Sequence, residues 1–560
     1  MKKKIGIPLL FLIIMFSVYA GYRLYHSTTI KIMFLKNKMV ELPEEPVLGV
    51  YDRGNSISQS ASRSIRHYAL ILNNDKPWKL EKNLLADLHD SIPVLLTVEI
   101  WDSQILKKTI AGEYDKNITE LFTEILKDNR TYYIRLFPHM DTSEGVLAWE
   151  MIPSDFTGAF ERFSSIIQKV APRAQMVWGP EGETGVMEFF PLDAHVKMAS
   201  INLNANLETI NSQLPNTIPY QLQRKLHRLR FIDKPILILG SKTINEDSFK
   251  MQWLTDAIDY MNNNEEGIYS EENFQRPEIV SQQPKDEELI IGLFDPNLLL
   301  VKEKQVSVEH LFTNFNGVRD GTLRLEMEDV ISRGHGLIIS VEPGPDKENN
   351  WDYNLLENIQ KGYYDEEIRE IYSLISEVND TVYLRFAHEM EIPITRYPWQ
   401  SKDPVEYIKA YRYFMNFGEA QHQNIKRIWG PAGDRGSLEW WPGNDVVDYI
   451  SIAIYGLPDK NITDPEKQES FSRIFGRKSS RFRLLNKPFF ITEFGVKGDE
   501  EFQNLWLREA AEILKQQNNV IGINYFNYQD SPGAWGEIQP PDWSISQETF
   551  RMFLEALNKK

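Results

Sequence analysis

The chain contains two copies of one sequence unit, and this internal repeat restricts its possible folds more than any other feature. The segment TYYIRLFPHMD (131–141) aligns without a gap on TVYLRFAHEME (381–391), and MVWGPEGETGVMEFFP (176–191) aligns on RIWGPAGDRGSLEWWP (427–442). A third pair, DKPILILGS and NKPFFITEF, keeps the same order. The pairs are 250, 251 and 253 residues apart (131 to 381, 176 to 427, 233 to 486). Chance matches would not keep this register, so we expect two domains of one fold.

A polar segment separates the two copies. Residues 262–288 are rich in Asn, Gln and Glu and predict a linker, which leaves one domain at 46–261 and another at 289–560. In both copies, nearly continuous apolar runs alternate with longer amphipathic segments, a pattern typical of buried parallel strands and covering helices. Seven or eight such steps in about 270 residues predict an α/β fold with two tandem (β/α)8 barrels of the TIM type. An open doubly wound sheet is the alternative.

The N-terminus predicts export. Lys2, Lys3 and Lys4 precede an uncharged apolar run at 5–22, which is about the length needed to cross a bilayer as a helix. We expect residues 1–27 to form a signal anchor, or a signal peptide if the segment is cleaved. Either reading places the two domains on the periplasmic or extracellular side, with the membrane as a partner in the anchored form.

Composition excludes several classes of function. The formal net charge is −18, so the chain is a poor candidate for binding a nucleic acid backbone. Cysteine is absent, which removes disulfides, thiolate metal sites and cysteine nucleophiles. Neither a Gly-rich phosphate turn nor an HExxH pattern occurs, so we expect no nucleotide, no metal and no other cofactor.

Two carboxylates stand at the ends of apolar runs in the second copy. LRFAHEM places His388 and Glu389 after the fourth expected strand, and FFITEFG places Glu493 at the end of the seventh. These strands face each other across a barrel mouth, where active residues gather. Two carboxyl groups about 5–5.5 Å apart suit retaining glycoside hydrolysis, in which one attacks the anomeric carbon and the other moves the proton.

With these residues, the second copy resembles glycoside hydrolase family 26, the β-mannanase-type group of retaining (β/α)8 glycosidases. The HEM sequence after an LRF-type strand and the ITEFG run carry the resemblance over about residues 289–560. The resemblance implies that Glu389 is the acid/base and Glu493 the nucleophile, that His388 orients the acid/base and the sugar, and that Tyr455 hydrogen-bonds the nucleophile. The loop after HEM departs from the family pattern, which leaves the sugar open.

Aromatic side chains gather where a sugar chain would lie, and their flat faces can pack on pyranose C–H surfaces. The candidates for glycan contact are Tyr397, Trp399, Trp440, Phe526 and Trp535. For Trp440, core packing is an equally good interpretation. Arg385 and Glu342 recur in the first copy as Arg135 and Glu99, so we interpret the arginine as a buried charge partner and the glutamate as structural.

The first copy lacks the catalytic residues. His139 stands in the place of Glu389, Gly240 in the place of Glu493 and Asn204 in the place of Tyr455. Neither carboxylate remains, so the two-carboxylate mechanism is not possible there. We expect this copy to keep the fold and to be non-catalytic.

The sequence therefore predicts an exported retaining β-glycoside hydrolase acting on a polysaccharide, with a β-mannan-like substrate favoured. One alternative is a non-catalytic glycan-binding or exopolysaccharide-assembly protein, because one copy has already lost its site. A second is a transglycosylase that uses the same residues.

Overall fold

The chain forms two compact units, one ending at Tyr260 and the other beginning at Met261. The computed structural model describes residues 39–41, 47–52, 64–72, 78, 91–100, 102–127, 129–142, 152–191, 196–203, 217–240, 251–270, 288–344, 352–394, 396–418, 424–457, 469–531 and 539–558. The expected signal anchor at residues 1–27 lies outside these ranges. No helix within them is long and apolar enough to span a membrane.

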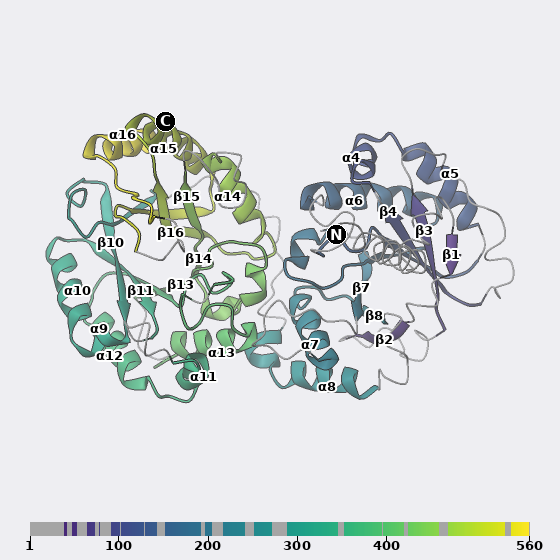
Figure 1. Ribbon diagram of the computed structural model, residues 1–560, viewed down its shortest axis with the longest axis horizontal. Coiled ribbons are helices and arrows are strands. Elements are labelled where there is room, and N and C mark those ends of the chain that lie inside the picture. Colours follow the sequence, from purple (N-terminus) through teal and green to yellow (C-terminus); the bar gives the residue numbers. More distant parts are fainter. Residues whose placement is uncertain are drawn as a thin grey trace, which may run out of the picture. The chain divides into compact units, whose positions relative to one another are not determined.

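The second unit is a closed parallel barrel (Figure 1). Its strands run in the order of the sequence, and β17 pairs with β9 to close the ring. The sixth position is shared by two short strands, β14 and β15, which both pair with β16. The strands are β9 (Ile290–Phe294), β10 (Val306–Asn314), β11 (Gly336–Glu342), β12 (Val382–Phe386), β13 (Ile425–Trp429), β14 (Tyr449–Ile450), β15 (Ala453–Gly456), β16 (Phe489–Val496) and β17 (Val520–Phe526).

Helices cover the outside of this barrel (Figure 1). They bury one apolar stripe each, as the amphipathic segments predict. Side-chain caps begin several of them: Asp403 accepts backbone N–H bonds at the start of α13, and Asp499 does so at α15. The helices are α9 (Phe315–Arg319), α10 (Thr322–Ser332), α11 (Leu355–Gln360), α12 (Asp365–Ser376), α13 (Pro404–Met415), α14 (Phe471–Ser480), α15 (Glu500–Gln516) and α16 (Gln547–Asn558).

The lower half of the barrel interior is apolar. One cluster of inward side chains from five strands fills it: Val308, Ile338, Tyr383, Ile428 and Phe490. This core leaves the carboxyl ends of the strands for polar side chains, which is where (β/α)8 barrels carry their sites.

The first unit is a curled, open sheet, and the prediction of a second closed barrel is wrong. Six parallel strands, β3 to β8, are flanked by β1 and β2, which pair antiparallel at the two edges. The strands are β1 (Met39–Glu41), β2 (Val47–Tyr51), β3 (Arg66–Leu72), β4 (Val94–Ile100), β5 (Tyr132–Leu136), β6 (Gln175–Trp178), β7 (Val196–Leu203) and β8 (Ile236–Gly240). The helices are α4 (Gln104–Ala111), α5 (Asp115–Ile125), α6 (Pro153–Val170), α7 (Ile218–Arg228) and α8 (Met251–Asn262).

Among the described residues, the first copy has no counterpart of β17, the strand that closes the barrel of the second copy. The segment NNVIGINYF, which contains β17, aligns on NNEEGIYSE at 263–271. Two glutamates there replace Val520 and Ile521, and a π-helical turn at Glu265–Tyr269 replaces the strand. The edge position beside β8 is taken by β2, which runs antiparallel. A barrel needs every strand of its ring, so a single missing strand leaves an open sheet.

The start of the predicted linker also differs from expectation. Residue 262 ends α8, the π-helical turn follows, and the side chains of Ile268 and Tyr269 are buried. Residues 271–287 lie outside the described ranges.

Candidate active site

The four predicted catalytic residues come from neighbouring and facing strands at one end of the barrel. Glu493 lies on β16, the seventh strand, and Tyr455 lies on β15 at the sixth position. His388 and Glu389 follow β12, the fourth strand, so the predicted strand positions are confirmed. Glu389 has a φ of 54°, a left-handed conformation that a glutamate rarely adopts. Such strain persists where the surrounding structure fixes the backbone, and it is common at functional sites.

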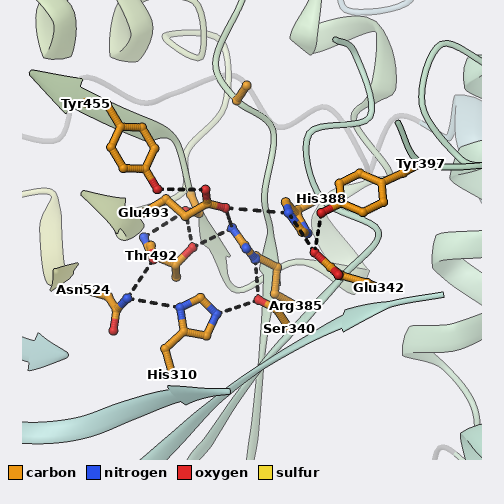
Figure 2. A network of polar contacts seen from close by, with 12 residues as sticks. His310, Ser340, Glu342, Arg385, His388, Tyr397, Tyr455, Thr492, Glu493 and Asn524 are labelled. Carbon is orange, nitrogen blue, oxygen red and sulfur yellow. Dashed lines mark hydrogen bonds and ion pairs between the residues drawn. The ribbon is translucent and has the colours of Figure 1, made fainter. Parts of the chain in front are cut away.

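Glu493 accepts hydrogen bonds from two donors (Figure 2). Its Oε1 accepts a hydrogen bond from Nη1 of Arg385 at 2.5 Å, and its Oε2 accepts one from the Tyr455 hydroxyl at 3.2 Å. The same Arg385 nitrogen donates to Oγ1 of Thr492 at 3.0 Å. The pairing of β16 with β17 shifts register between Ile491 and Phe494. This irregularity lets the adjacent side chains of Thr492 and Glu493 both reach Arg385. The carboxylate is thereby oriented and its charge is balanced.

Arg385 confirms the expectation of a buried charge partner inside the barrel. Its side chain is 2% exposed, and its Nε donates to Oγ of Ser340 at 2.7 Å. Arg385 passes close to the turn that follows β13. A Cβ atom on Gly430 in this turn would lie 2.6 Å from Cδ of Arg385. The WGP glycine thus gives the arginine the room to reach Glu493.

Glu389 has the opposite environment. Burial, followed by the negative charges of Glu493 and Glu391, holds the pKa of Glu389 well above its ordinary value. No hydrogen bond or ion pair reaches its carboxyl group from the residues that the structure describes. The site therefore combines one carboxyl group with a raised pKa, Glu389, and a second, Glu493, that is paired with a cation. This is the division of roles that an acid/base and a nucleophile require.

His388 lies between two carboxylates. Its Nε2 is 3.7 Å from Oε1 of Glu342 and 3.9 Å from Oε1 of Glu493. Burial, then the charges of Arg385 and Arg396, holds the pKa of His388 well below its usual value, so the ring is neutral. Both distances exceed a hydrogen bond. A sugar hydroxyl placed there could bond to the ring and to a carboxylate together.

Glu342, which the sequence analysis interprets as structural, lies beside His388 at the barrel mouth. It ends β11 at the barrel mouth, its side chain is 25% exposed, and it accepts a 2.9 Å hydrogen bond from the Tyr397 hydroxyl. Burial raises the pKa of Glu342. Its recurrence as Glu99 suggested a structural role, but its position beside His388 makes it part of the site. The strand-end rule that selected Glu389 could also have selected it.

A second row of polar residues supports the first. Nε2 of His310 lies 2.7 Å from Oγ of Ser340, and Nδ2 of Asn524 lies 3.1 Å from Nδ1 of His310 (Figure 2). Asn524 also donates to the backbone oxygen of Thr492 at 3.0 Å. Burial holds the pKa of His310 well below its ordinary value. These neutral groups tie β10, β11, β16 and β17 together beneath Arg385.

The structure corrects two of the aromatic predictions. Trp399 is 1% exposed, and its indole N–H donates to the backbone oxygen of His388 at 2.8 Å. Trp440 is 6% exposed and packs edge-on against Tyr407 in the core. Neither ring has a free face for a sugar. The indole N–H of Trp399 instead holds the backbone of the loop that follows β12.

The other aromatic predictions have different outcomes. Tyr397 is partly exposed, but its ring stacks on Trp399 at 4.4 Å and its hydroxyl is used by Glu342. Phe526 is partly exposed at the end of β17, where it stacks on Phe294. Trp535 lies outside the described residues.

In the first unit, the positions that align with Glu493 and Arg385 have different contacts. Gly240 ends β8, and a Cβ atom there would lie 2.8 Å from Cδ1 of Leu48, so an apolar side chain fills the place of the nucleophile. Arg135 donates instead to Oδ1 of Asn202 at 3.1 Å. Nδ1 of His139 pairs with Oε1 of Glu181 at 2.5 Å. Asn204 lies outside the described residues. Across the described ranges of both units, no group of three His, Asp or Glu side chains could hold a metal ion.

Comparison with known proteins finds similarity to two curated β-1,3-xylanases. No family model matches the chain. A β-1,3-xylanase from an Alcaligenes species is 22% identical over 201 residues, which cover 32% of this chain and 42% of that protein. The β-1,3-xylanase TXYA from a Vibrio species is 23% identical over 203 residues, which cover 32% of this chain and 43% of that protein. The chain thus spans less than half the length of these curated relatives.

Solved structures of similar fold include β-mannanases. The GH26-CBM35 β-(1,4)-mannanase of Podospora anserina has a TM-score of 0.32 and 15% identity, and the match covers 47% of this chain and 64% of that one. A β-mannanase from a symbiotic protist of the termite Reticulitermes speratus has a TM-score of 0.33 and 14% identity, with 48% and 86% covered. The barrel itself is defined by the strand order and closure of the second unit.

Proposed function

We propose that the second unit is a retaining β-glycoside hydrolase that acts on a β-glycan. The observation that carries the proposal is the contrast between the two carboxyl groups. Glu493 is bound by Arg385 and Tyr455, whereas Glu389 is partly buried, has no partner in the described structure and has a raised pKa. Two acids at a barrel mouth, one paired with a cation and the other with a raised pKa, suit double displacement.

In the first step, an oxygen of Glu493 attacks the anomeric carbon while Glu389 gives its proton to the departing glycosidic oxygen. The products are a glycosyl ester on Glu493 and the released aglycone. In the second step, ionised Glu389 takes a proton from water, and that water displaces Glu493 with net retention. Tyr455 and Arg385 hold the nucleophile, and His388 with Glu342 would bind hydroxyls of the reacting sugar.

Two substrate classes follow from the resemblances. The HEM and ITEFG runs favour a β-mannan-like chain, and the curated relatives favour a β-1,3-linked xylan. We also propose that the protein is exported and held at a membrane by residues 1–27. A non-catalytic glycan-binding protein remains the rival, because the first unit keeps its fold without either catalytic carboxylate.

The test is hydrolysis of a β-glycan panel by the full chain, with the anomer of the first product read by proton NMR. We expect the β-anomer. Glu493→Ala should lose hydrolysis by about 10⁴-fold or more. Azide added to that variant should give an α-glycosyl azide from an activated β-glycoside, because the small anion takes the place of the nucleophile.

Azide added to Glu389→Ala should instead give a β-glycosyl azide, because it attacks the intermediate on Glu493. An α-product from the wild type, or unchanged activity in Glu493→Ala, would refute the mechanism. Glycan binding without any hydrolysis would support the rival, and products longer than the substrate would identify a transglycosylase.

A further inference from the structure

The barrel mouth of the second unit is divided into a polar half and an aromatic half. The polar half comes from β11, β12, β15 and β16 and carries Glu342, His388, Tyr455 and Glu493. The aromatic half comes from the other side of the ring, β17, β9 and β10. There one inward layer consists of phenylalanine: Phe526, Phe294 and Phe312. Asn314 ends β10 two residues beyond Phe312, and its Oδ1 accepts the backbone N–H of Gly317.

The residues one layer below, His310, Asn524 and Gly292, show that these phenylalanine rings point into the barrel. His310 and Asn524 hydrogen-bond each other inside the barrel, and a Cβ atom on Gly292 would meet Asn524 at 2.7 Å. Side chains two residues further along a strand point to the same side. The three phenylalanines are each two residues beyond one of these positions, so they form the layer directly above.

The rings form one continuous surface. Phe294 stacks on Phe526 with ring centroids 4.6 Å apart and meets Phe312 edge-on at 5.1 Å. Tyr528, which is 40% exposed, extends the surface at 6.3 Å from Phe294. All three phenylalanines are only partly buried, whereas the phenylalanine at the bottom of the barrel, Phe490, is 0% exposed. We call Phe294, Phe312 and Phe526 the aromatic floor.

The aromatic floor touches the catalytic groups. The ring of Phe312 lies 6.0 Å from that of His388, and the ring of Phe526 lies 6.4 Å from that of Tyr455. Both ring nitrogens of His310 beneath the floor are already used, by Ser340 and by Nδ2 of Asn524. The Oδ1 atom of Asn524 has no partner among the described residues, but it is buried below the rings, 2.7 Å from the place of a Cβ atom on Gly292. A sugar hydroxyl directed at this floor would therefore lose its water and gain no hydrogen bond, at a cost of roughly 1–3 kcal/mol.

The positions of the two carboxyl groups decide which sugar lies on the floor. Glu389 follows the fourth strand and protonates the leaving group, so the leaving group lies toward β12. The glycone lies on the opposite side, which is β17 with its neighbours β9 and β10. Its C2 hydroxyl adjoins the reacting carbon, where Nε2 of His388 stands 3.9 Å from Oε1 of Glu493. In a pyranose ring, C1 lies between C2 and the ring oxygen, and C5 is bonded to that oxygen. When C2 of the glycone lies in the polar half, its C5 therefore faces the aromatic floor.

We propose that the aromatic floor forms the glycone subsite and selects a sugar without a C6 hydroxyl, which is a pentopyranosyl or a 6-deoxyhexopyranosyl residue. This specificity rests on the proposed hydrolase activity and narrows its substrate class. A hexopyranose would turn its hydroxymethyl group toward Phe294 and Phe526. A hydrogen or a methyl group on C5 packs against the same rings without an unpaired hydroxyl.

The experiment compares matched aryl β-glycosides that differ only at C6, with the full chain. One pair is β-D-xyloside and β-D-glucoside, and the other is β-D-fucoside and β-D-galactoside; disaccharide glycosides replace them if a longer glycone is needed. We expect kcat/KM to favour the member without the C6 hydroxyl by at least about tenfold. Phe526→Asn and Phe312→Asn, which add a hydrogen-bonding group to the floor, should each reduce this ratio.

Phe490→Leu is the matched control, because it shortens a phenylalanine of the same barrel away from the mouth. It should lower thermal stability and leave the ratio unchanged. A wild-type ratio near one, or an unchanged ratio in both asparagine variants that remain folded by circular dichroism, would overturn the proposal while hydrolysis itself stands.

If the wild type hydrolyses no glycoside, the hydrolase proposal fails and the floor is tested by binding. Calorimetric titration of the full-length Glu493→Gln variant with xylobiose and cellobiose measures the same C6 preference. Tighter binding of xylobiose, reduced by Phe526→Asn, supports the floor. Equal affinities, or no binding of either sugar, overturn it.

Discussion

The two units share a framework around the strand-end loops and differ in what that framework carries. In the first unit, Lys225 donates to the backbone oxygen of Glu181 and Arg228 to that of Gly182. In the second, Lys478 donates to Ala432 and Arg481 to Gly433, which are the aligned positions. The acids Asp141 and Glu391, also aligned, both accept backbone N–H groups of this same loop.

The strained backbone after the fourth strand of the repeat is also retained. Phe137 and His139 have φ values of 49° and 66°, and Ala387 and Glu389 have values of 46° and 54°. His139 therefore occupies the backbone position of the acid/base without being one. Duplication preserved the hydrogen bonds that shape the loops, because their loss would destabilise the fold, while the side chains that act on a ligand changed freely.

The reactive part of the site differs because one cation has changed partners. Arg385 bonds Glu493, whereas Arg135 bonds Asn202, and Asn202 in turn donates to Glu181. A buried arginine needs acceptors in either case. The first unit supplies them from β7 and β6 because Leu48 fills the place where the nucleophile would stand.

The largest difference in kcat between variants of the two units should appear when Arg385 or its counterpart Arg135 is replaced. Arg385→Gln leaves Glu493 buried without its cation, so we expect kcat to fall by about 100-fold or more and the free energy of unfolding to fall by about 3 kcal/mol. Arg135→Gln should lower stability and leave kcat unchanged. Steady-state kinetics and chemical denaturation measure both. Equal losses of kcat in the two variants would show that the first unit takes part in the reaction.

A smaller effect is expected from the paired loop acids. The negative charge of Glu391 helps to raise the pKa of Glu389, which must be protonated to act. Activity is lost as the pH rises through that pKa, so Glu391→Gln should move the alkaline limb of kcat/KM to lower pH. Asp141→Asn, at the aligned position, should leave the limb in place. An alkaline limb that moves upward in Glu391→Gln would contradict the assignment of Glu389.

The smallest effect concerns stability of the first unit alone. The His139 side chain is 44% exposed, so desolvation opposes its protonation only weakly, and the Glu181 carboxylate raises the pKa of His139 to about 9. Burial would raise the pKa of Glu181, but His139 and Lys225 lower it to about 2. The contribution of His139 is complete below about pH 6.5 and is lost as the pH rises through 9, and that of Glu181 is lost below about pH 4.5.

His139→Gln should therefore lower the melting temperature of the first unit most near pH 5–6, and the difference from wild type should shrink above pH 9. Glycan hydrolysis should be unaffected at any pH where the chain is folded. A constant difference in melting temperature across this range would show that the ion pair does not contribute to stability.

The residues by themselves determined the repeat, the barrel of the second unit and the strand ends at which Glu389, Glu493 and Tyr455 lie. These features are local or periodic: apolar runs of strand length, amphipathic helices and polar residues at the points where strands stop. Arg385 could also be predicted as a buried charge, because an arginine within an apolar strand requires a partner.

Only the tertiary structure decided whether each sheet closes and which rings face a ligand. Closure requires the eighth strand to pair with the first, which is more than 200 residues away in the sequence. The first copy has a π-helical turn where the sequence of the eighth strand aligns. Trp399 looked like a loop residue open to sugar, yet it packs beneath the backbone of His388. Burial and pairing across a barrel are sums of long-range contacts, and a sequence pattern with a range of a few residues does not contain them.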